Sequence, residues 1–254
     1  MSEFVKPPKS LLRTVGQTLV QYRMLNEGDR VLLGLSGGKD SLSLLHILEH
    51  FRRHAPVRFT LAAITIDPMS ESFDPSPLKP YLAALGVPYF YESQPIVTLA
   101  DRHMDNDSYC AFCSRMKRGL MYKVARENGF NVLALGQHLD DLAESFLMSA
   151  FHGGRLNTMK VHYLNDAGDV RIIRPLARVR ERQTRDFAQA AGLPVIHENC
   201  PACFDSPTQR AHMKALLGAE EAGHPMLFKS LLSAMRPLME AGLEAALAAG
   251  PREP

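Results

Sequence analysis

Residues 31–41 read Val-Leu-Leu-Gly-Leu-Ser-Gly-Gly-Lys-Asp-Ser, and the apolar run Leu-Ser-Leu-Leu-His-Ile-Leu follows at 42–48. This order predicts a buried strand, a tight glycine turn and a helix. A glycine turn at a helix N-terminus directs backbone N–H groups and the positive end of the helix dipole at one point, where phosphate is the usual occupant. The segment therefore predicts a phosphate site at the start of a helix.

The side chains of this loop suit such a site. Two glycines let the backbone come close to the anion, two hydroxyls add donors, a lysine adds a point charge and an aspartate can hold Mg²⁺. These are, in chain order, Ser36, Gly37, Gly38, Lys39, Asp40 and Ser41. The pattern differs from the P-loop of kinases and GTPases, which needs Gly, four residues and then Gly-Lys-Ser/Thr.

The bulk properties limit the class of protein. The 254 residues, 46% of them apolar, suffice for one large α/β domain with a real core, and a net charge of +2 means that any affinity for nucleic acid must come from local patches. No segment reaches the roughly 18 apolar residues of a membrane helix, and the first residues lack the apolar region of a signal peptide. We therefore expect a cytoplasmic protein with no membrane partner.

The chain alternates predicted strands and helices. Strands are expected at 31–35, 59–66, 87–91 and 131–135, with helices at about 10–26, 77–85, 113–128, 139–152 and 180–191, and a β-hairpin turn at 165–168. This order is typical of a doubly wound parallel sheet. We divide the chain into a lead and helix (1–27), the sheet domain (28–207) and a helical tail (208–254), interrupted at Pro225 and Pro237.

All four cysteines fall in two C-x-x-C pairs, Cys110/Cys113 and Cys200/Cys203. In a cytosolic protein such pairs indicate metal ligands or catalytic thiols rather than disulfides. The spacing alone leaves a Cys₄ zinc site and an iron–sulfur cluster open. The two pairs border different parts of the predicted domain, which favours chemistry over a structural staple.

Several motifs together resemble a known family. The Ser36–Ser41 loop looks like the pyrophosphate loop (PP-loop) of N-type ATP pyrophosphatases, which cleave ATP between its α and β phosphates. With it, in order, stand Cys-Ala-Phe-Cys-Ser-Arg-Met-Lys-Arg-Gly (110–119), Leu-Gly-Gln-His-Leu-Asp-Asp (135–141), Ile-Arg-Pro-Leu (173–176), Cys-Pro-Ala-Cys (200–203) and Gln-Arg (209–210). Over roughly residues 10–215 the chain resembles the tRNA 2-thiocytidine synthetases, which convert cytidine 32 to 2-thiocytidine.

The resemblance implies a set of roles. ATP, Mg²⁺ and a [4Fe–4S] cluster are the expected cofactors, with Cys110, Cys113 and Cys200 as cluster ligands and Cys203 as a cysteine that is not a ligand. It implies an adenylated base as intermediate, tRNA as partner and a cysteine desulfurase as sulfur source, and it leaves a homodimer open. We expect catalytic roles for Lys39, Asp40 and Cys203, with Mg²⁺ on Asp40.

The chain also departs from the family pattern. Gln137 stands where the family usually has histidine, and the tail is short. The alternatives are a tRNA 2-thiouridine synthetase, although those enzymes typically carry extra cysteine pairs, and a zinc-stabilised PP-loop enzyme with another substrate.

Other candidate residues lie where strands are expected to end. Gly136, His138, Asp140 and Asp141 follow one strand, and the carboxyl edge of an open α/β sheet is where ligands bind. We assign Gly136, His138 and Asp141 to the nucleotide site, although acidic residues also simply favour a helix N-terminus. Asp67 either borders the adenosine or forms a turn before Pro68.

Two basic runs adjoin these motifs, and together they predict a track for RNA phosphates, although a single charge run is usually a solvated face. They are Arg115, Lys117, Arg118, Lys123 and Arg126, and Arg171, Arg174, Arg178, Arg180, Arg182 and Arg185.

Overall fold

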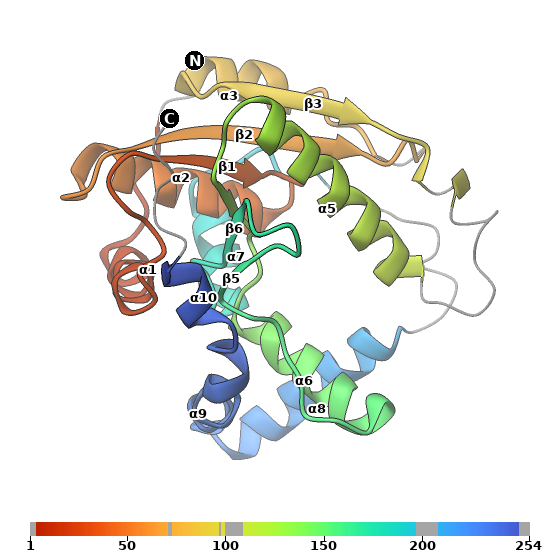
Figure 1. Ribbon diagram of the computed structural model, residues 1–254. Coiled ribbons are helices and arrows are strands. Elements are labelled where there is room, and N and C mark those ends of the chain that lie inside the picture. Colours follow the sequence, from red (N-terminus) through yellow and green to blue (C-terminus); the bar gives the residue numbers. More distant parts are fainter. Residues whose placement is uncertain (1–3, 71–72, 97, 100–108, 197–207, 249–254) are drawn as a thin grey trace.

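The computed structural model describes residues 4–70, 73–96, 98–99, 109–196 and 208–248. A six-stranded sheet in the order β3-β2-β1-β4-β6-β5 lies at its centre (Figure 1). All neighbouring strands pair in parallel except β5 and β6, which form an antiparallel hairpin. The expected doubly wound, mostly parallel sheet is confirmed. The strands are β1 (Asp29–Gly34), β2 (Phe59–Asp67), β3 (Tyr89–Ser93), β4 (Val132–Ala134), β5 (His162–Leu164) and β6 (Arg171–Ile173).

Helices cover both faces of the sheet. They are α1 (Lys9–Gln21), α2 (Lys39–His54), α3 (Leu78–Leu85), α5 (Tyr109–Glu127), α6 (Leu139–Gly153), α7 (Glu181–Ala190), α8 (Gln209–Gly223), α9 (Leu227–Met239) and α10 (Leu243–Ala248). Helices α8–α10 follow the sheet and pack below it against α6 and β5. Among the described residues, no helix has both the length and the apolarity needed to cross a membrane.

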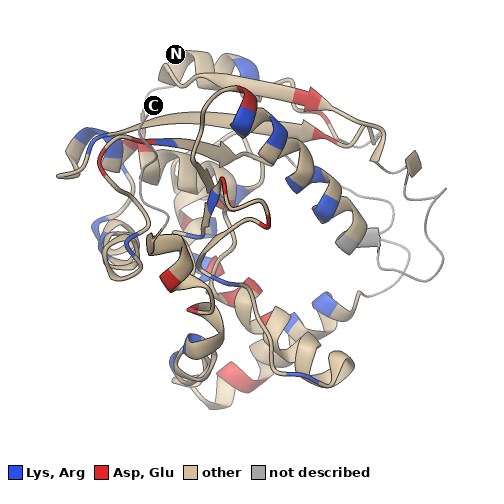
Figure 2. Ribbon diagram, in the orientation of Figure 1, with Lys and Arg blue, Asp and Glu red and all other residues tan. Residues whose placement is uncertain are grey.

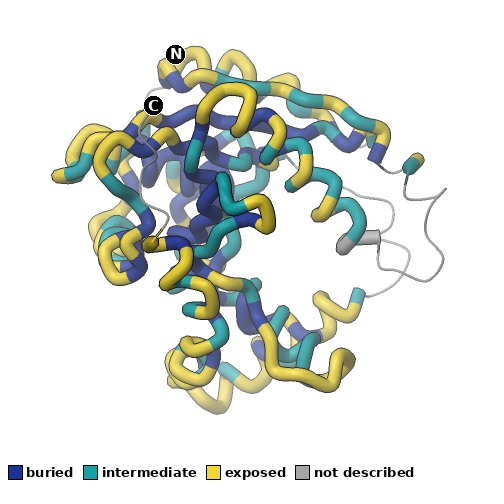
Figure 3. The backbone as a smooth tube through the Cα atoms, in the orientation of Figure 1, coloured by how far each residue is buried: buried dark blue, intermediate teal, exposed yellow. Residues whose placement is uncertain are grey.

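The central strand explains why the core has two halves. Alternate residues of a strand face opposite sides of the sheet. Val31 and Leu33 join the apolar cluster that contains α2, whereas Leu32 joins the cluster that contains α5, and all three are fully buried. Figure 3 shows the centre of the sheet in the colour of buried residues. Burying each such side chain stabilises the fold by ~1.5–3 kcal/mol, so the continuous apolar run specifies a strand covered on both faces.

Two expectations about helices are wrong. The first helix ends at Gln21 rather than near residue 26. The carbonyl of Tyr22 accepts a hydrogen bond from His162 Nδ1 (2.8 Å), and the side chain of Met24 is buried in the core, so the chain leaves the helix at this point. Pro237 lies inside α9 rather than interrupting it. Its missing N–H removes one helical hydrogen bond, but it lies only two residues before the end of α9, and the buried residues Met235 and Met239 hold this turn in the core. The break at Pro225, between α8 and α9, is confirmed.

A histidine in α2 makes the fold sensitive to acid. His46 is fully buried, its Nδ1 accepts from the backbone N–H of Val5 (3.3 Å), and its Nε2 hydrogen-bonds the Tyr81 hydroxyl (2.5 Å). Burial lowers the pKa of His46 from 6.5 to about 4. The unfolded chain therefore binds a proton at a higher pH than the folded chain does, and folding stability falls as the pH drops from about 6.5 to 4.

We predict that His46 contributes about 3 kcal/mol to this acid-induced loss of stability, since one pKa unit corresponds to 1.36 kcal/mol. His46→Gln should lower the free energy of unfolding at neutral pH but flatten its decline toward acid, as measured by urea denaturation at a series of pH values. His152→Gln, at an exposed position of α6, provides the control and should retain the decline of stability toward acid. A His46→Gln curve parallel to that of the wild type would contradict this account.

Candidate functional site

The glycine loop lies between β1 and α2, and its conformation is held by hydrogen bonds of its own serine hydroxyls. Ser36 Oγ accepts from the Gly38 N–H (3.3 Å) and lies 3.2 Å from Ser41 Oγ, while the Ser41 hydroxyl donates to the Gly38 carbonyl (3.0 Å). Gly38 is the N-cap of α2, so the first N–H groups of the helix lack helical partners at this point. The loop therefore offers backbone donors at the positive end of a helix, as its sequence predicts.

Gly37 is required for two reasons. Its φ of +84° lies in the left-handed region, which an L side chain adopts only with strain. A Cβ at this position would also lie 2.7 Å from Ile196 Cδ1. The Ile196 N–H donates to the Gly37 carbonyl (2.9 Å), so the segment after α7 packs directly on the loop.

The loop after β4 forms the second side of the site. Strands β1 and β4 are parallel neighbours at the centre of the sheet, and the chain leaves them toward β2 on one side and toward β6 and β5 on the other. The carboxyl edge at such a point is the usual place for a ligand. A Cβ on Gly136 would lie 3.3 Å from the Ser41 nitrogen, so the two loops touch. His138 caps α6 in a reciprocal pair with Asp141, with N–H to acceptor distances of 3.2 and 2.9 Å. His138 Nε2 lies 3.7 Å from Asp40 Oδ2, so this cap also faces the glycine loop.

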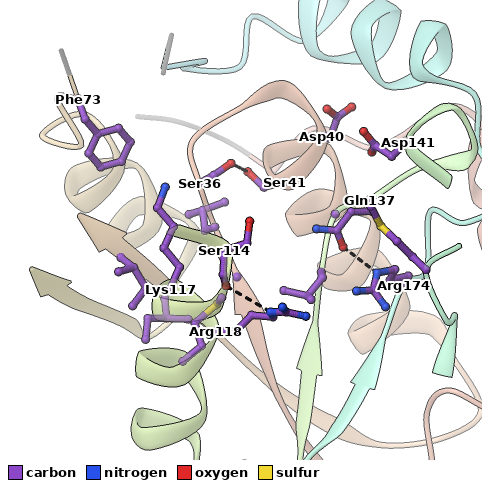
Figure 4. Close-up of a pocket in the computed structure, with 18 of the residues that line it drawn as sticks. Ser36, Asp40, Ser41, Phe73, Ser114, Lys117, Arg118, Gln137, Asp141 and Arg174 are labelled. Atoms are coloured by element: carbon purple, nitrogen blue, oxygen red, sulfur yellow. Dashed lines mark hydrogen bonds between the residues drawn. The ribbon is translucent and has the colours of Figure 1, made fainter. Parts of the chain in front are cut away.

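A cavity of about 550 Å³ opens between these loops and α5 (Figure 4). Its volume is within the roughly 300–1,000 Å³ typical of small-molecule sites. The walls combine apolar residues from β2, from α5 and from the segment after β4 with hydroxyls, two carboxylates and four cations. The residues that bear most on function are Ser36, Asp40, Ser41, Ile64, Ile66, Phe73, Lys117, Arg118, Gln137, Asp141, Met159, Arg174 and Arg210.

Lys39 is held between two carboxylates. Its Nζ lies 2.9 Å from Asp40 Oδ2 and 3.0 Å from Glu181 Oε1, and Glu181 Oε2 lies 2.6 Å from the Lys214 ammonium. Burial acts to raise the pKa of Glu181, but the hydrogen bonds and charges of Lys214 and Lys39 outweigh it and hold that pKa at about 2. Burial likewise opposes the charge on Lys39, but Asp40 and Glu181 outweigh it and raise the pKa of Lys39. Both groups therefore stay ionised at neutral pH.

Helix α7 also fixes the aspartate of the loop. The hydroxyl of the buried Thr184 donates to Asp40 Oδ1 (2.5 Å). One turn earlier, Arg180 binds Asp140 and Glu221, with nitrogen–oxygen distances of 3.0 and 2.5 Å, and its guanidinium carbon lies 3.3 Å from the centre of the Phe228 ring. The N-terminus of α7 thus connects the glycine loop to α6, α8 and α9.

Known proteins are similar to this chain in sequence and in fold. The model of the PP-loop domain matches residues 9–204. A tRNA-cytidine(32) 2-sulfurtransferase from Geobacter sulfurreducens is 39% identical over 228 residues, covering 89% of each chain, and one from Cronobacter sakazakii is 36% identical, covering 91% of this chain and 74% of its own. The chain belongs to the tRNA-cytidine(32) 2-sulfurtransferase family.

The fold of this family also occurs in a solved structure. The U34-tRNA thiolase NcsA from Methanococcus maripaludis, solved with its [4Fe–4S] cluster, matches with a TM-score of 0.74 and 23% sequence identity, over 91% of this chain and 78% of the other. At that identity the likeness is one of fold. The family predicted from the motifs is confirmed, and it is a family of tRNA sulfurtransferases.

Many of the residues that the sequence predicts for the nucleotide site lie together around the cavity. Ser36, Asp40, Ser41, Gly136 and Asp141 all line the cavity. Lys39 is not among the described lining residues, because its ammonium is paired with Glu181 and Asp40. Asp67 is not among them either. Asp67 instead accepts from the Met69 N–H (2.7 Å) and the Tyr91 hydroxyl, so it stabilises the turn after β2.

The described part of the chain includes the side chain of one predicted cysteine ligand, Cys113. Cys113 is half-buried in α5, and Lys117, one turn further on, lines the cavity. The side chain of Cys110, together with Cys200 and Cys203, lies outside the described residues.

The two basic runs differ in structure. Lys and Arg are spaced along α5, and Lys117 and Arg118 line the cavity (Figure 2). The second run does not form one RNA track, and that expectation is wrong. Arg171 is buried in an ion pair with Asp29, and Arg180 is enclosed by Asp140 and Glu221.

Sequence reasoning missed several residues of the site. Thr184 and Ile196 contact the glycine loop, and Phe73 and Met159 line the cavity. Thr184 lies 144 residues from Asp40 in the chain, and no local pattern marks such a contact.

We predict that Gly37→Ala destabilises the protein more than Gly86→Ala does. Both glycines have positive φ, +84° and +69°, but a Cβ on Gly86 would meet nothing within 4 Å. Gly86→Ala should therefore cost only the backbone strain of about 1–2 kcal/mol, and Gly37→Ala should cost that strain plus the clash with Ile196. Denaturant titration of each variant gives the two losses.

The clash is tested separately with Ile196→Ala. In that background Gly37→Ala should cost less than in the wild-type chain, because the Cδ1 and Cγ1 atoms of residue 196 are gone, while the backbone strain and a 3.1 Å contact with its Cβ remain. Equal losses for the two glycine variants in the otherwise wild-type chain would show that Ile196 does not constrain the loop.

Proposed function

We propose that this protein is an ATP-dependent tRNA thiolase that converts cytidine 32 to 2-thiocytidine through an adenylated base. The observation that carries the proposal is the shared cavity. One wall is a phosphate-binding loop at a helix N-terminus, and another is α5, the helix that contains the first cysteine pair. Membership of the tRNA-cytidine(32) 2-sulfurtransferase family supports the same substrate.

The glycine loop suits the phosphates of ATP. The N–H groups at the start of α2 and the hydroxyls of Ser36 and Ser41 are donors for phosphate oxygens. An ammonium has three donors, and the two carboxylates that hold Lys39 use two of them, which leaves one for a phosphate oxygen. The apolar side chains of Ile64 and Ile66, which line the same cavity, suit the adenine ring.

Magnesium fits the same cavity. Asp40 and Asp141 both line it, and carboxylate oxygens are preferred Mg²⁺ ligands. Asp40 is the principal ligand in this proposal. Its two oxygens already accept from Thr184 and Lys39, but an ionised carboxylate has about four lone-pair sites, so it can also coordinate a metal.

The loop residues stabilise the charge that develops during adenylation. The O2 oxygen of cytidine attacks the α-phosphate, a new P–O bond forms and the bond to pyrophosphate breaks. Negative charge then grows on the leaving pyrophosphate, where the helix N-terminus and Lys39 are placed to stabilise it. Sulfur later replaces the adenylated oxygen at C2, and AMP leaves with that oxygen.

The cysteine pairs fit a cluster in this proposal. Thiolates are the protein ligands of iron–sulfur clusters. Cys110 and Cys113 are three residues apart in α5, so they share one face of the helix. Cys110, Cys113 and Cys200 would hold a [4Fe–4S] cluster that supplies the sulfur atom when bound, and Cys203 is proposed not to be a ligand. The sulfur originates from a cysteine desulfurase.

The basic face of α5 suits the RNA. Arg115 and Lys123 lie on the same helix as Arg118, which lines the cavity, and RNA affinity is dominated by phosphate contacts of basic side chains. The target base has to leave its stack to enter the cavity, which costs a few kcal/mol and less in a single-stranded loop. A cytoplasmic location with tRNA follows from this substrate.

The proposal predicts a specific nucleoside in tRNA. In a strain that lacks the gene, mass spectrometry of tRNA nucleosides should show loss of 2-thiocytidine. The wild-type gene should restore it, and Asp40→Asn should not, because the amide keeps the shape and the Thr184 contact but not the charge for Mg²⁺. Asp186→Asn, at an exposed carboxylate of α7, is the matched control and should restore the nucleoside. Unchanged 2-thiocytidine in the deletion strain, or loss of 2-thiouridine instead, would refute the proposed substrate.

The cysteine roles give a second prediction, based on metal content. Anaerobically purified Cys110→Ala, Cys113→Ala and Cys200→Ala should each lose iron and acid-labile sulfide, because each lacks a thiolate ligand. Cys203→Ala should keep both. A Cys₄ zinc site would give a different pattern, with zinc in the wild type and metal loss in all four variants. Iron loss in Cys203→Ala equal to that in the others would show that four cysteines hold the cluster.

A further inference from the structure

Arg174 is a buried cation at the wall of the cavity. It follows β6 at the carboxyl edge of the sheet, and only 5% of its surface is exposed. Its Nε donates to Gln137 Oε1 (2.9 Å), its Nη1 donates to the Lys160 carbonyl, and its guanidinium carbon lies 5.4 Å from the centre of the Tyr163 ring. Figure 4 shows Arg174 and Gln137 side by side in the cavity wall.

All of these partners are electrically neutral. Among the described residues, no carboxylate lies within ion-pair distance of Arg174. Three other arginines that are buried or near the cavity do pair with carboxylates. Arg171 pairs with Asp29, Arg180 with Asp140 and Glu221, and Arg210, in the same cavity, with Asp141 and Glu144.

A buried, unpaired charge is costly. An arginine stays protonated in proteins, and hydrogen bonds to neutral groups replace only part of the hydration that a buried ion loses when it has no counter-ion. The protein holds the guanidinium at this position with neutral acceptors alone. An anion from outside the chain, entering the cavity, would supply the missing charge.

We propose that Arg174 is a phosphate receptor and that Gln137 is its positioning residue. The inference rests on the proposed function in that the cavity holds a nucleotide or a stretch of RNA. A guanidinium has five N–H donors, of which the two hydrogen bonds above use two, and its fork matches phosphate oxygens. The phosphate is either the α-phosphate of the nucleotide or a backbone phosphate of RNA.

The neutral side chain of Gln137 is central to this role. Its amide oxygen orients Nε without cancelling the charge of the guanidinium. A glutamate at this position would keep the hydrogen bond but supply an internal counter-ion. It would therefore stabilise the empty site and compete with the ligand, two effects that a purely structural arginine would not combine.

The chain contains a matched control pair outside the cavity. Arg178 Nη1 donates to Gln21 Oε1 at the same distance, 2.9 Å, and neither residue lines the cavity. Arg174→Met and Gln137→Glu are therefore compared with Arg178→Met and Gln21→Glu. Equilibrium binding of ATP, AMP, pyrophosphate and an anticodon stem-loop RNA is measured with each protein, and melting temperature is measured without ligand.

Arg174→Met should weaken binding of the phosphate ligand about 10- to 100-fold, as expected for loss of a charge-assisted hydrogen bond. Gln137→Glu should weaken the same ligand and raise the melting temperature, and neither control should change ligand affinity. If ATP and AMP weaken but pyrophosphate does not, the receptor binds the α-phosphate. If only the RNA weakens, it binds an RNA phosphate.

Two results would overturn the inference: unchanged affinities for every ligand in Arg174→Met, or unchanged affinities in Gln137→Glu. The second variant decides the matter if Arg174→Met does not fold. Failure of the proposed function gives a different result, because the wild-type protein would then bind no ATP, while the RNA arm would still test Arg174.

Discussion

The site depends on a cross-link between the first turns of two helices. Asp40, in α2, accepts from Thr184 of α7, and Lys39, beside it, is paired with Glu181 of α7. The glycine loop has few other means of fixing these two side chains, since its own hydrogen bonds involve serines and backbone. The position of the charged end of the loop is therefore set by a helix that comes some 140 residues later in the chain.

This cross-link extends into the C-terminal helices. Glu181 is shared between Lys39 and Lys214, so removing either lysine still leaves the carboxylate one counter-ion. Arg210, Lys214 and Glu221 are spaced by four and seven residues and lie on one face of α8. All three pair with residues of α6 and the N-terminus of α7, and the buried Leu217 lies among them on the same face. The tail thus contributes to the site through ion pairs as well as packing.

The parts of the fold that were predictable are those encoded by contiguous residues. The apolar run before the glycine loop specifies β1, and Gly37 and Gly86 are glycines because the backbone there has positive φ. The same reasoning gives the edge of the sheet where the site lies, because parallel strands end together. The positions of Ser36, Ser41, Gly136 and Asp141 follow from this local information and the topology.

The remainder depends on contacts that no local pattern records. Arg171, Arg174 and Arg178 belong to one basic run in the sequence, yet the first is buried against Asp29, the second lies in the cavity wall and the third bonds Gln21. The register of β6 decides this, since it places Arg171 at the amino end of a three-residue strand and Arg174 just past its carboxyl end. Asp67 was similarly ambiguous, because the same carboxylate suits a ligand or a turn, and only the positions of Met69 and Tyr91 select the turn.

The distribution of charge around the cavity follows from these contacts. Arg210 reaches it already paired with Asp141 and Glu144, and Lys39 reaches the loop already paired with Asp40 and Glu181. Those cations are balanced before any ligand arrives, so an anionic ligand has to share them with carboxylates. Arg174 has no such competitor among the described residues, and its full charge is available to a ligand. Paired cations fix the geometry of the site, whereas a guanidinium held by neutral groups keeps its charge for an entering phosphate.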